Sequence, residues 1–264
     1  MTESTTTATP APSRSRKRLL TQNRQLRAEG IFNWPLPAWA GRLDDGRTYN
    51  TCPEAGACAR LCYARTGTYR FSNVLAAHER NLKMILDTPV EWEETMAAEL
   101  AHKRYQGKWV RLHDSGDFFS DSYVLAWMRL MRGAPQVRFY AYTKAVSRVR
   151  RLVAPNPPAN FSWCYSLGGT EDHLLDLAAE RHAEVFPDTA DLEEAGYHDQ
   201  SSSDLLAVLG PERVGIPANP IPHLLRRQGR ETFGSLQRAM DARRAQKNQR
   251  AADRTGMNHT PEIA

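Results

Sequence analysis

The chain has 264 residues, 41% of them hydrophobic, and a formal charge of +5. A chain of this length buries the core of one large domain or two small ones, and we expect one. No apolar run approaches the roughly 18 residues that span a bilayer, and residues 1–20 lack the apolar core of a secretory signal. We therefore expect a cytoplasmic protein without membrane segments.

The positive charge is concentrated at the two ends of the chain. Residues 1–30 carry six Lys/Arg against two Asp/Glu, and residues 221–264 carry nine against four. The segment between them is net acidic, which argues against a nucleic-acid groove built into the core. The ends are instead expected to contact phosphate weakly and in a salt-dependent way.

The ends also differ from the middle in composition. The chain begins with a polar, proline-containing segment that ends in SRSRKR and cannot bury enough apolar surface to fold alone. We expect a disordered basic N-terminal tail over residues 1–18, a single α/β domain over residues 19–245, and a disordered polar C-terminal tail over residues 246–264.

Few regular elements are predicted before the first cysteine. A short helix fits within residues 19–28, and two prolines with two tryptophans make residues 31–41 an extended, packed segment. The run Asp44-Asp45-Gly46 predicts a turn. Residues 48–51 are expected to form a short strand that leads into a cysteine-rich loop.

After this loop, helix-length and strand-length segments alternate. Start signals and apolar spacing predict one helix from Ser72 to about Leu86 and a second from Pro89 to about Tyr105. A third helix is predicted after its cap at Ser120 and ends at Gly133. Aromatic and β-branched residues predict strands at 109–113, 137–143 and 160–169, the last ending in a glycine turn. The sequence also predicts a short basic helix after 143, a helix over 171–181 capped by Thr170, and a basic helix from Pro220. Between the last two, strand and helix alternate less clearly through AEVF (183–186) and RVGIP (213–217). Strands separated by helices imply parallel βαβ units, so the predicted fold class is α/β.

Three of the four cysteines fall within eleven residues: Cys52, Cys58 and Cys62, spaced C-x5-C-x3-C. Thiolates on one short loop can close around a metal centre with little loss of chain entropy. Zinc sites usually need four ligands and favour C-x2-C pairs, so three cysteines favour an iron–sulfur cluster with one open iron. The alternatives are buried hydrophobic cysteines or a disulfide, although four cysteines are too few for a disulfide framework.

Polar residues recur where predicted strands end. Four such clusters occupy residues 52–62, 113–117, 143–144 and 164–169. Parallel α/β folds place their ligand-binding groups at the carboxyl ends of strands. The clusters are therefore expected to meet at one site.

The order of these motifs resembles the radical S-adenosylmethionine (SAM) enzymes. CPEAGACARLCYA stands where that family has its cysteine motif, VRLHDSGDFFS resembles its GGEP segment, and RFYAYTK resembles its third strand. The cysteine spacing here is five and three, against three and two in that family. The resemblance implies a partial parallel (β/α) barrel, a 4Fe–4S cluster on the three cysteines, and SAM as a second cofactor.

A closer resemblance is to the phage-associated Gene Product 88 family, whose members have CP…C…CYA…G followed by an SGD turn. It covers most of residues 45–220 and implies no particular reaction.

The radical SAM resemblance implies that Asp117 holds the SAM ammonium. The predicted cofactor-contacting residues are Tyr63, Ser115, Gly116, Asp117 and Thr143, and the predicted catalytic residues are His113 and Lys144.

Each of these residues also has a structural explanation. His113, Asp114 and Asp117 can form a hydrogen-bonded turn without a ligand, and Tyr63 can serve packing alone. Lys144 either ends a strand in solvent or holds a carboxylate of cofactor or substrate. Cys164 is either a core residue or a fourth cluster ligand.

Three functions follow from these patterns. The first is an iron–sulfur enzyme that cleaves SAM reductively to a 5′-deoxyadenosyl radical, which attacks an unknown substrate. The second is a non-enzymatic, metal-stabilised phage or plasmid accessory protein that binds nucleic acid or a host protein through its basic ends. The third is a metal-dependent phosphoesterase built on His113, Asp114 and Asp117.

Overall fold

A computed structural model describes residues 18–218 and 221–257, with only the backbone of residues 254–257. Residues 1–17 of the expected N-terminal tail lie outside the described residues. Within this range, no helix is long and apolar enough to cross a membrane.

The centre of the molecule is a seven-stranded sheet in which every neighbouring pair of strands is parallel. Its strand order is β1-β4-β5-β6-β7-β9-β8. The strands are β1 (Ile31–Trp34), β4 (Trp109–Leu112), β5 (Arg138–Thr143), β6 (Phe161–Ser166), β7 (His182–Phe186), β8 (His198–Asp199) and β9 (Arg213–Pro217). The prediction of an α/β fold with parallel strands is confirmed.

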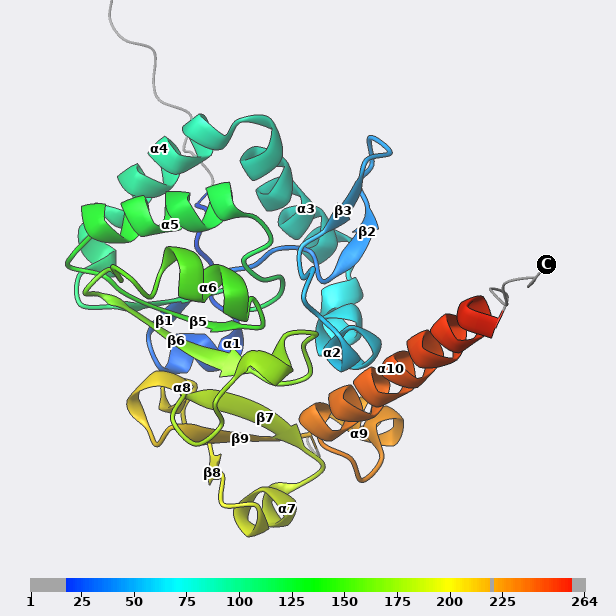
Figure 1. Cartoon of the computed structure of the whole chain (residues 1–264). Helices are drawn as coiled ribbons and strands as arrows, with labels where there is room; N and C mark the ends of the chain where they lie inside the picture. Colours follow the sequence, from blue (N-terminus) through cyan, green and yellow to red (C-terminus); the bar gives the residue numbers. More distant parts are fainter. Residues whose placement is uncertain (1–17, 219–220, 258–264) are drawn as a thin grey trace, which may run out of the picture.

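One face of the sheet is covered by four helices, α3 (Ser72–Asp87), α4 (Pro89–Leu100), α5 (Asp121–Gly133) and α6 (Val146–Leu152), which Figure 1 shows together on one side. Strands β1, β4, β5, β6 and β7 are neighbours in chain order. Right-handed crossovers between such strands place their helices on the same face. The main hydrophobic core lies there, where Val110 and Phe139 of the strands meet Trp92 and Trp127 of the helices.

The opposite face carries a smaller core. Leu26 of α1 (Arg24–Ala28) and Ala207 of α8 (Leu206–Leu209) pack against Tyr140, Cys164 and Val214 of the strands. Because alternate strand residues point to opposite faces, Arg111, Tyr142 and Ser166 follow on this same face, toward the carboxyl edge of the sheet. This edge is where the functional residues gather.

The first strand of the sheet differs from the sequence prediction. Residues 31–41, expected to be irregular, contain β1, which pairs with β4 from Ile31–Trp109 to Trp34–Leu112. The segment expected to lead into the cysteine loop as a strand, β3 (Thr48–Asn50), pairs with β2 (Ala40–Arg42) in a separate hairpin. The predicted turn closes that hairpin, and its Gly46 has a φ of +89°, a conformation that favours glycine.

The helix start signals were partly correct. The Ser120 side chain accepts a hydrogen bond from the Tyr123 N–H and caps α5, as predicted. Helix α3 begins at Ser72, but Phe71 occupies the cap position and no side-chain cap forms.

The helix predicted over 171–181 is wrong, because only a short 3-10 turn, η4 (Asp172–Leu174), forms there. The Asp172 carboxylate accepts the N–H groups of Gly168 and Gly169 and so closes a turn in place of a helix.

In the described part of the chain, two helices follow the last strand. These are α9 (Pro222–Gln228) and α10 (Phe233–Met257), and α10 extends away from the body of the molecule in Figure 1. Helix α10 includes residues 246–257 of the segment expected to be a disordered tail. The first turns of α10 lie against α2 (Ala57–Leu61) and β7.

Candidate functional site

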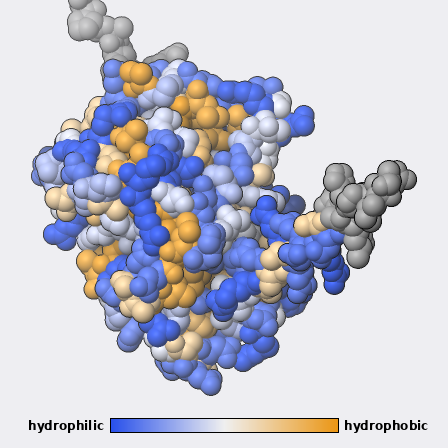
Figure 2. Space-filling view, in the orientation of Figure 1, coloured by the Kyte–Doolittle hydropathy of each residue, from blue (hydrophilic) through white to orange (hydrophobic). Residues whose placement is uncertain are grey.

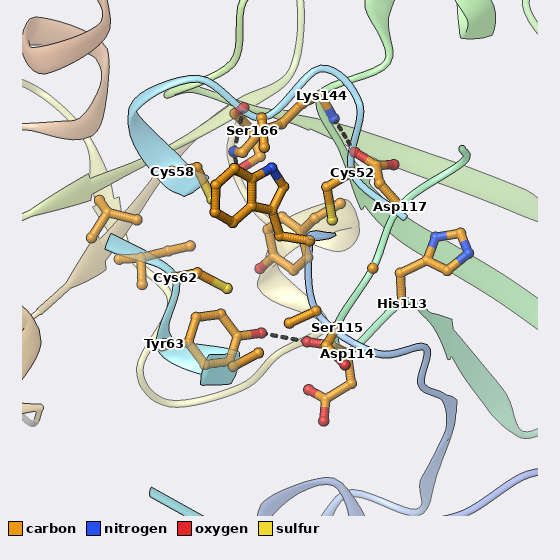
Figure 3. Close-up of a pocket in the computed structure, with 18 of the residues that line it drawn as sticks. Cys52, Cys58, Cys62, Tyr63, His113, Asp114, Ser115, Asp117, Lys144 and Ser166 are labelled. Carbon is orange, nitrogen blue, oxygen red and sulfur yellow. Dashed lines mark hydrogen bonds between the residues drawn. The ribbon is translucent and has the colours of Figure 1, made fainter. Parts of the chain in front are cut away.

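A cavity of about 370 Å³ lies at the carboxyl edge of the sheet. All ten residues predicted to form a site line it, and Figure 3 labels all of them except Gly116 and Thr143 around a common space. They come from the cysteine loop and from the segments that follow β4 and β5. Ser166, at the end of β6, joins them. The expectation that the polar clusters at the strand ends would meet at one site is thus met in the geometry. The lining includes Cys52, Cys58, Cys62, Tyr63, His113, Ser115, Gly116, Asp117, Thr143, Lys144 and Ser166.

Local helix geometry brings the cysteines to this cavity. Cys58 lies in α2, and Cys62 is the residue that ends it. Residues four apart share a face of a helix, so the C-x3-C spacing places both thiols on one side. Cys52 lies in the preceding turn, whose Ala55 N–H donates to the Cys52 carbonyl. All three cysteines are half-buried and form no disulfide.

The cysteine loop is fastened to the end of β6. The Gly168 carbonyl accepts the N–H groups of both Gly56 and Cys58, at 3.1 and 3.0 Å. Gly168 has a φ of +94°, and a Cβ there would lie 3.1 Å from Phe233. The glycine turn predicted at this position therefore positions a cysteine directly.

Lys144 holds this same turn. Its ammonium donates to the Ser166 carbonyl and hydroxyl, both at 2.8 Å, and to the Leu167 carbonyl at 2.9 Å. These contacts use all three donors of the ammonium. Lys144 thus links β5 to the turn that carries the cysteine loop, and its predicted catalytic role remains a prediction.

A second contact that holds the cysteine loop comes from α10, and the sequence did not predict it. The Gln237 side-chain oxygen accepts the Ala57 N–H at 2.7 Å, and Gln237 is 1% exposed. A Cβ on Gly56 would lie 1.8 Å from that oxygen, so only glycine leaves room for the contact. The two partners are 180 residues apart, and no short-range pattern could have revealed the pairing.

The SGD turn packs against the segment after β1. The Ser115 hydroxyl donates to the Leu36 carbonyl, and the Leu36 N–H donates back to the Ser115 carbonyl. Gly116 has a φ of +87°, and a Cβ there would collide with Leu36. Ser115 and Gly116 therefore set the path of the turn that brings Asp117 to the cavity.

Asp117 is buried where the SGD turn meets the end of β5. Its carboxylate accepts the Thr143 hydroxyl at 2.7 Å, the Phe118 N–H at 2.7 Å and the Lys144 N–H at 2.8 Å. Burial raises the pKa of Asp117 above its usual range, and these hydrogen bonds oppose the rise. A carboxylate has about four acceptor positions, so one stays available for a ligand.

His113 is held within the protein. Its Nε2 lies 3.0 Å from the Tyr123 hydroxyl, which itself accepts the Trp34 indole N–H. Burial, followed by the nearby Arg111 charge, lowers the pKa of His113 to about 3. Its imidazole lies edge-on to Phe118 at 4.7 Å. These contacts hold His113 in place within the fold, and its predicted catalytic role remains a prediction.

A polar network beside the cysteines was not predicted. Arg111 pairs with Asp204 at 3.0 Å and lies 3.9 Å from the Asp114 carboxylate. Tyr69 donates to that carboxylate at 2.8 Å, and Tyr63 donates to the Asp114 carbonyl at 2.5 Å. Arg111 lies on the sheet face opposite the four helices, as the alternation of side chains along β4 predicts. Asp204 comes from a loop whose position sequence patterns do not predict.

The residues predicted for a phosphoesterase site line one cavity, but each side chain is held by a different partner. His113 contacts Tyr123, Asp114 contacts Tyr69, and Asp117 contacts Thr143. Among the described residues, no three His, Cys, Asp or Glu side chains are placed to hold a metal ion. The interpretation of His113, Asp114 and Asp117 as one metal site is therefore wrong for this geometry.

The fourth cysteine belongs to the core. Cys164 is fully buried in the cluster of Tyr140, Ala183 and Val214. Burial raises its thiol pKa to about 12. Burial also raises the pKa of the Cys52 thiol, and that of Cys62 to about 11. Of the two roles considered for Cys164, the core position is the one observed.

Comparison with known proteins gives two kinds of match. The Gene product 88 family model matches residues 11–253. The Gene 88 protein of Mycobacterium phage L5 is 34% identical over 110 residues, covering 39% of this chain and 46% of the phage protein. The Gene 88 protein of Mycobacterium phage D29 is 33% identical over 110 residues, covering 39% and 45%. The matched part spans slightly less than half the length of these curated relatives.

No solved structure matches the chain. The resemblance to radical SAM enzymes finds no support in these comparisons, whereas the resemblance to the phage family does.

Proposed function

This chain belongs to the Gene product 88 family, and we propose that it is an iron–sulfur protein that binds SAM and cleaves it reductively to start radical chemistry on a substrate. One observation carries the proposal. Three thiols from one eleven-residue loop line a cavity together with polar groups from the ends of successive parallel strands. A structural metal site would be closed and would not need such a cavity.

The number and sequence spacing of the thiols support a cluster over a single zinc ion, because zinc sites usually need four ligands and favour C-x2-C pairs. Cys52, Cys58 and Cys62 line the same cavity. These residues would hold a 4Fe–4S cluster, which would supply the electron for SAM cleavage.

Strand order supports a partial barrel. Strands β1, β4, β5, β6 and β7 are neighbours in chain order, whereas doubly wound sheets reverse direction near their middle. We infer a partial (β/α) barrel whose cysteine loop follows the first strand. The SGD turn then follows the second strand, and Thr143 and Lys144 end the third.

The chain's own residues would bind and orient SAM. Asp117 offers an anionic oxygen to the ammonium, and the backbone of Ser115 and Gly116 sets its position. The Tyr63 ring stands beside the last cysteine, where it can border the cofactor. Val185, Ile216 and Leu224 also line the cavity; they are apolar and would exclude water from the reacting groups.

The Asp117 carboxylate gives the most direct test of SAM binding. Charge-assisted hydrogen bonds are worth roughly 1.5–3 kcal/mol, so Asp117→Asn should weaken SAM binding by about ten- to a hundredfold and leave iron in place. The asparagine would also place an NH₂ group against the Lys144 N–H, where the wild-type carboxylate accepts a hydrogen bond. Because two donors then face each other, a lower melting temperature is expected. Calorimetry on anaerobically reconstituted protein measures the affinity.

Asp114→Asn is the matched control, because Asp114 is a carboxylate on the wall of the same cavity. Its effect on SAM affinity should be much smaller. The reaction is tested in parallel by searching for 5′-deoxyadenosine after reduction with dithionite. If wild-type protein with an intact cluster neither binds SAM nor forms 5′-deoxyadenosine, the enzyme proposal is wrong, and a metal-stabilised phage accessory protein becomes the better account.

A further inference from the structure

The last two helices that the structure describes carry one of the two basic ends of the chain. Residues 222–253 carry eight Lys/Arg against three Asp/Glu, an excess equal to the formal charge of +5 of the whole chain. One of these cations, Arg230, pairs with Asp188 and Asp191. Within the part of the chain that the structure describes, Arg243, Arg244, Lys247 and Arg250 form no ion pair.

These four cations lie on a helix that projects into solvent. Figures 1 and 2 show α10 leaving the body of the molecule with a largely hydrophilic surface. Every side chain from Ala242 to Asp253 is exposed. Arg243, Lys247 and Arg250 are spaced four and three residues apart, so they share one face, and together they border one shallow surface recess.

We propose that this basic face of α10 binds the phosphate backbone of duplex DNA. A row of unpaired cations on a rigid rod complements the closely spaced phosphates of a duplex. The major groove of B-DNA admits an α-helix, whereas the major groove of A-form RNA is too narrow for side chains to read. A helix whose side chains are all exposed from Ala242 to Asp253 therefore fits DNA better than duplex RNA.

The root of α10 connects this surface to the candidate site. Phe233 lines the cavity, and Gln237 caps the loop that carries the cysteines. DNA bound along α10 would lie beside the cavity. The charge and shape of the helix carry the inference by themselves, so it does not depend on the proposed cluster or on SAM.

The test measures binding of the full-length protein to a short labelled duplex DNA by fluorescence anisotropy over a series of salt concentrations. A triple variant, Arg243→Gln, Lys247→Gln and Arg250→Gln, removes three cations from one face. Each lost phosphate contact lowers the salt slope by about 0.9, so the slope should fall by about 2 to 3. Affinity at low salt should fall about tenfold or more.

A matched triple variant removes the same charge elsewhere. Arg27→Gln, Lys103→Gln and Lys108→Gln alter exposed residues at the opposite edge of the sheet, before β1 and β4. This variant should keep the wild-type slope. Absence of DNA binding, or an equal loss in both triple variants, would overturn the proposal. Equally tight binding to duplex RNA would overturn the choice of DNA.

Discussion

Two residues of the cavity wall, Trp39 and His113, hold a left-handed backbone conformation, with φ of 54° and 63°. This conformation costs a residue other than glycine roughly 1–2 kcal/mol. The Trp39 carbonyl accepts two hydrogen bonds from Thr51, and the Arg65 guanidinium lies 5.1 Å from the indole centre. Strain of this kind concentrates at functional sites and is offset by surrounding contacts.

The buried His113 should make the stability of the protein depend on pH. Its folded pKa of about 3 lies below the ordinary value of 6.5. Between these values the unfolded chain binds a proton that the folded chain does not, so stability present above pH 6.5 is lost as the pH falls. The slope reaches at most about 1.4 kcal/mol per pH unit. Denaturation of wild-type protein and His113→Gln from neutral to acidic pH measures it.

His113→Gln removes this titration and keeps an acceptor for the Tyr123 hydroxyl. The free energies of unfolding of the two proteins should therefore converge as the pH falls. Parallel curves across the acidic range would show that His113 is not held neutral in the folded protein.

At the scale of elements, the cysteine loop depends on two segments distant in sequence. The turn after β6 binds Gly56 and Cys58, and α10 caps Ala57 through Gln237. A buried N–H that loses its partner costs roughly 1–3 kcal/mol. Gln237→Leu should lower the melting temperature and loosen the loop, so that less iron is retained after gel filtration.

Gln246→Leu makes the same change on the exposed part of the same helix. It should leave both the melting temperature and the iron content unchanged. If Gln237→Leu retains iron and stability like this control, then α10 does not hold the loop.

The sequence predicts the elements with strong local patterns. The aromatic and β-branched run at 137–143 forms β5, and Ser120 caps α5. Cysteine spacing and strand ends also identify ten of the residues that line the cavity. By contrast, β1 has only four residues and gains its stability from pairing with β4, which local composition does not encode. The Arg111–Asp204 pair joins residues 93 apart, so its detection required the fold.

At the scale of the whole molecule, the helix-covered face and the carboxyl edge of the parallel sheet have different contents. Its helix-covered face holds the main core, and its carboxyl edge gathers three thiols, a buried carboxylate and a buried ammonium in one cavity. The basic helix α10 starts at this edge and extends outward. The central claim is that Cys52, Cys58 and Cys62 hold an iron–sulfur cluster in that cavity.

Quantifying iron, acid-labile sulfide and zinc in anaerobically purified protein tests this claim most directly. We expect about four irons and matching sulfide per chain. Cys52→Ala, Cys58→Ala or Cys62→Ala should each abolish the cluster, whereas Cys164→Ala should keep it, because Cys164 lies in the core. Stoichiometric zinc without sulfide in the wild-type protein, or loss of iron only in Cys164→Ala, would contradict the account.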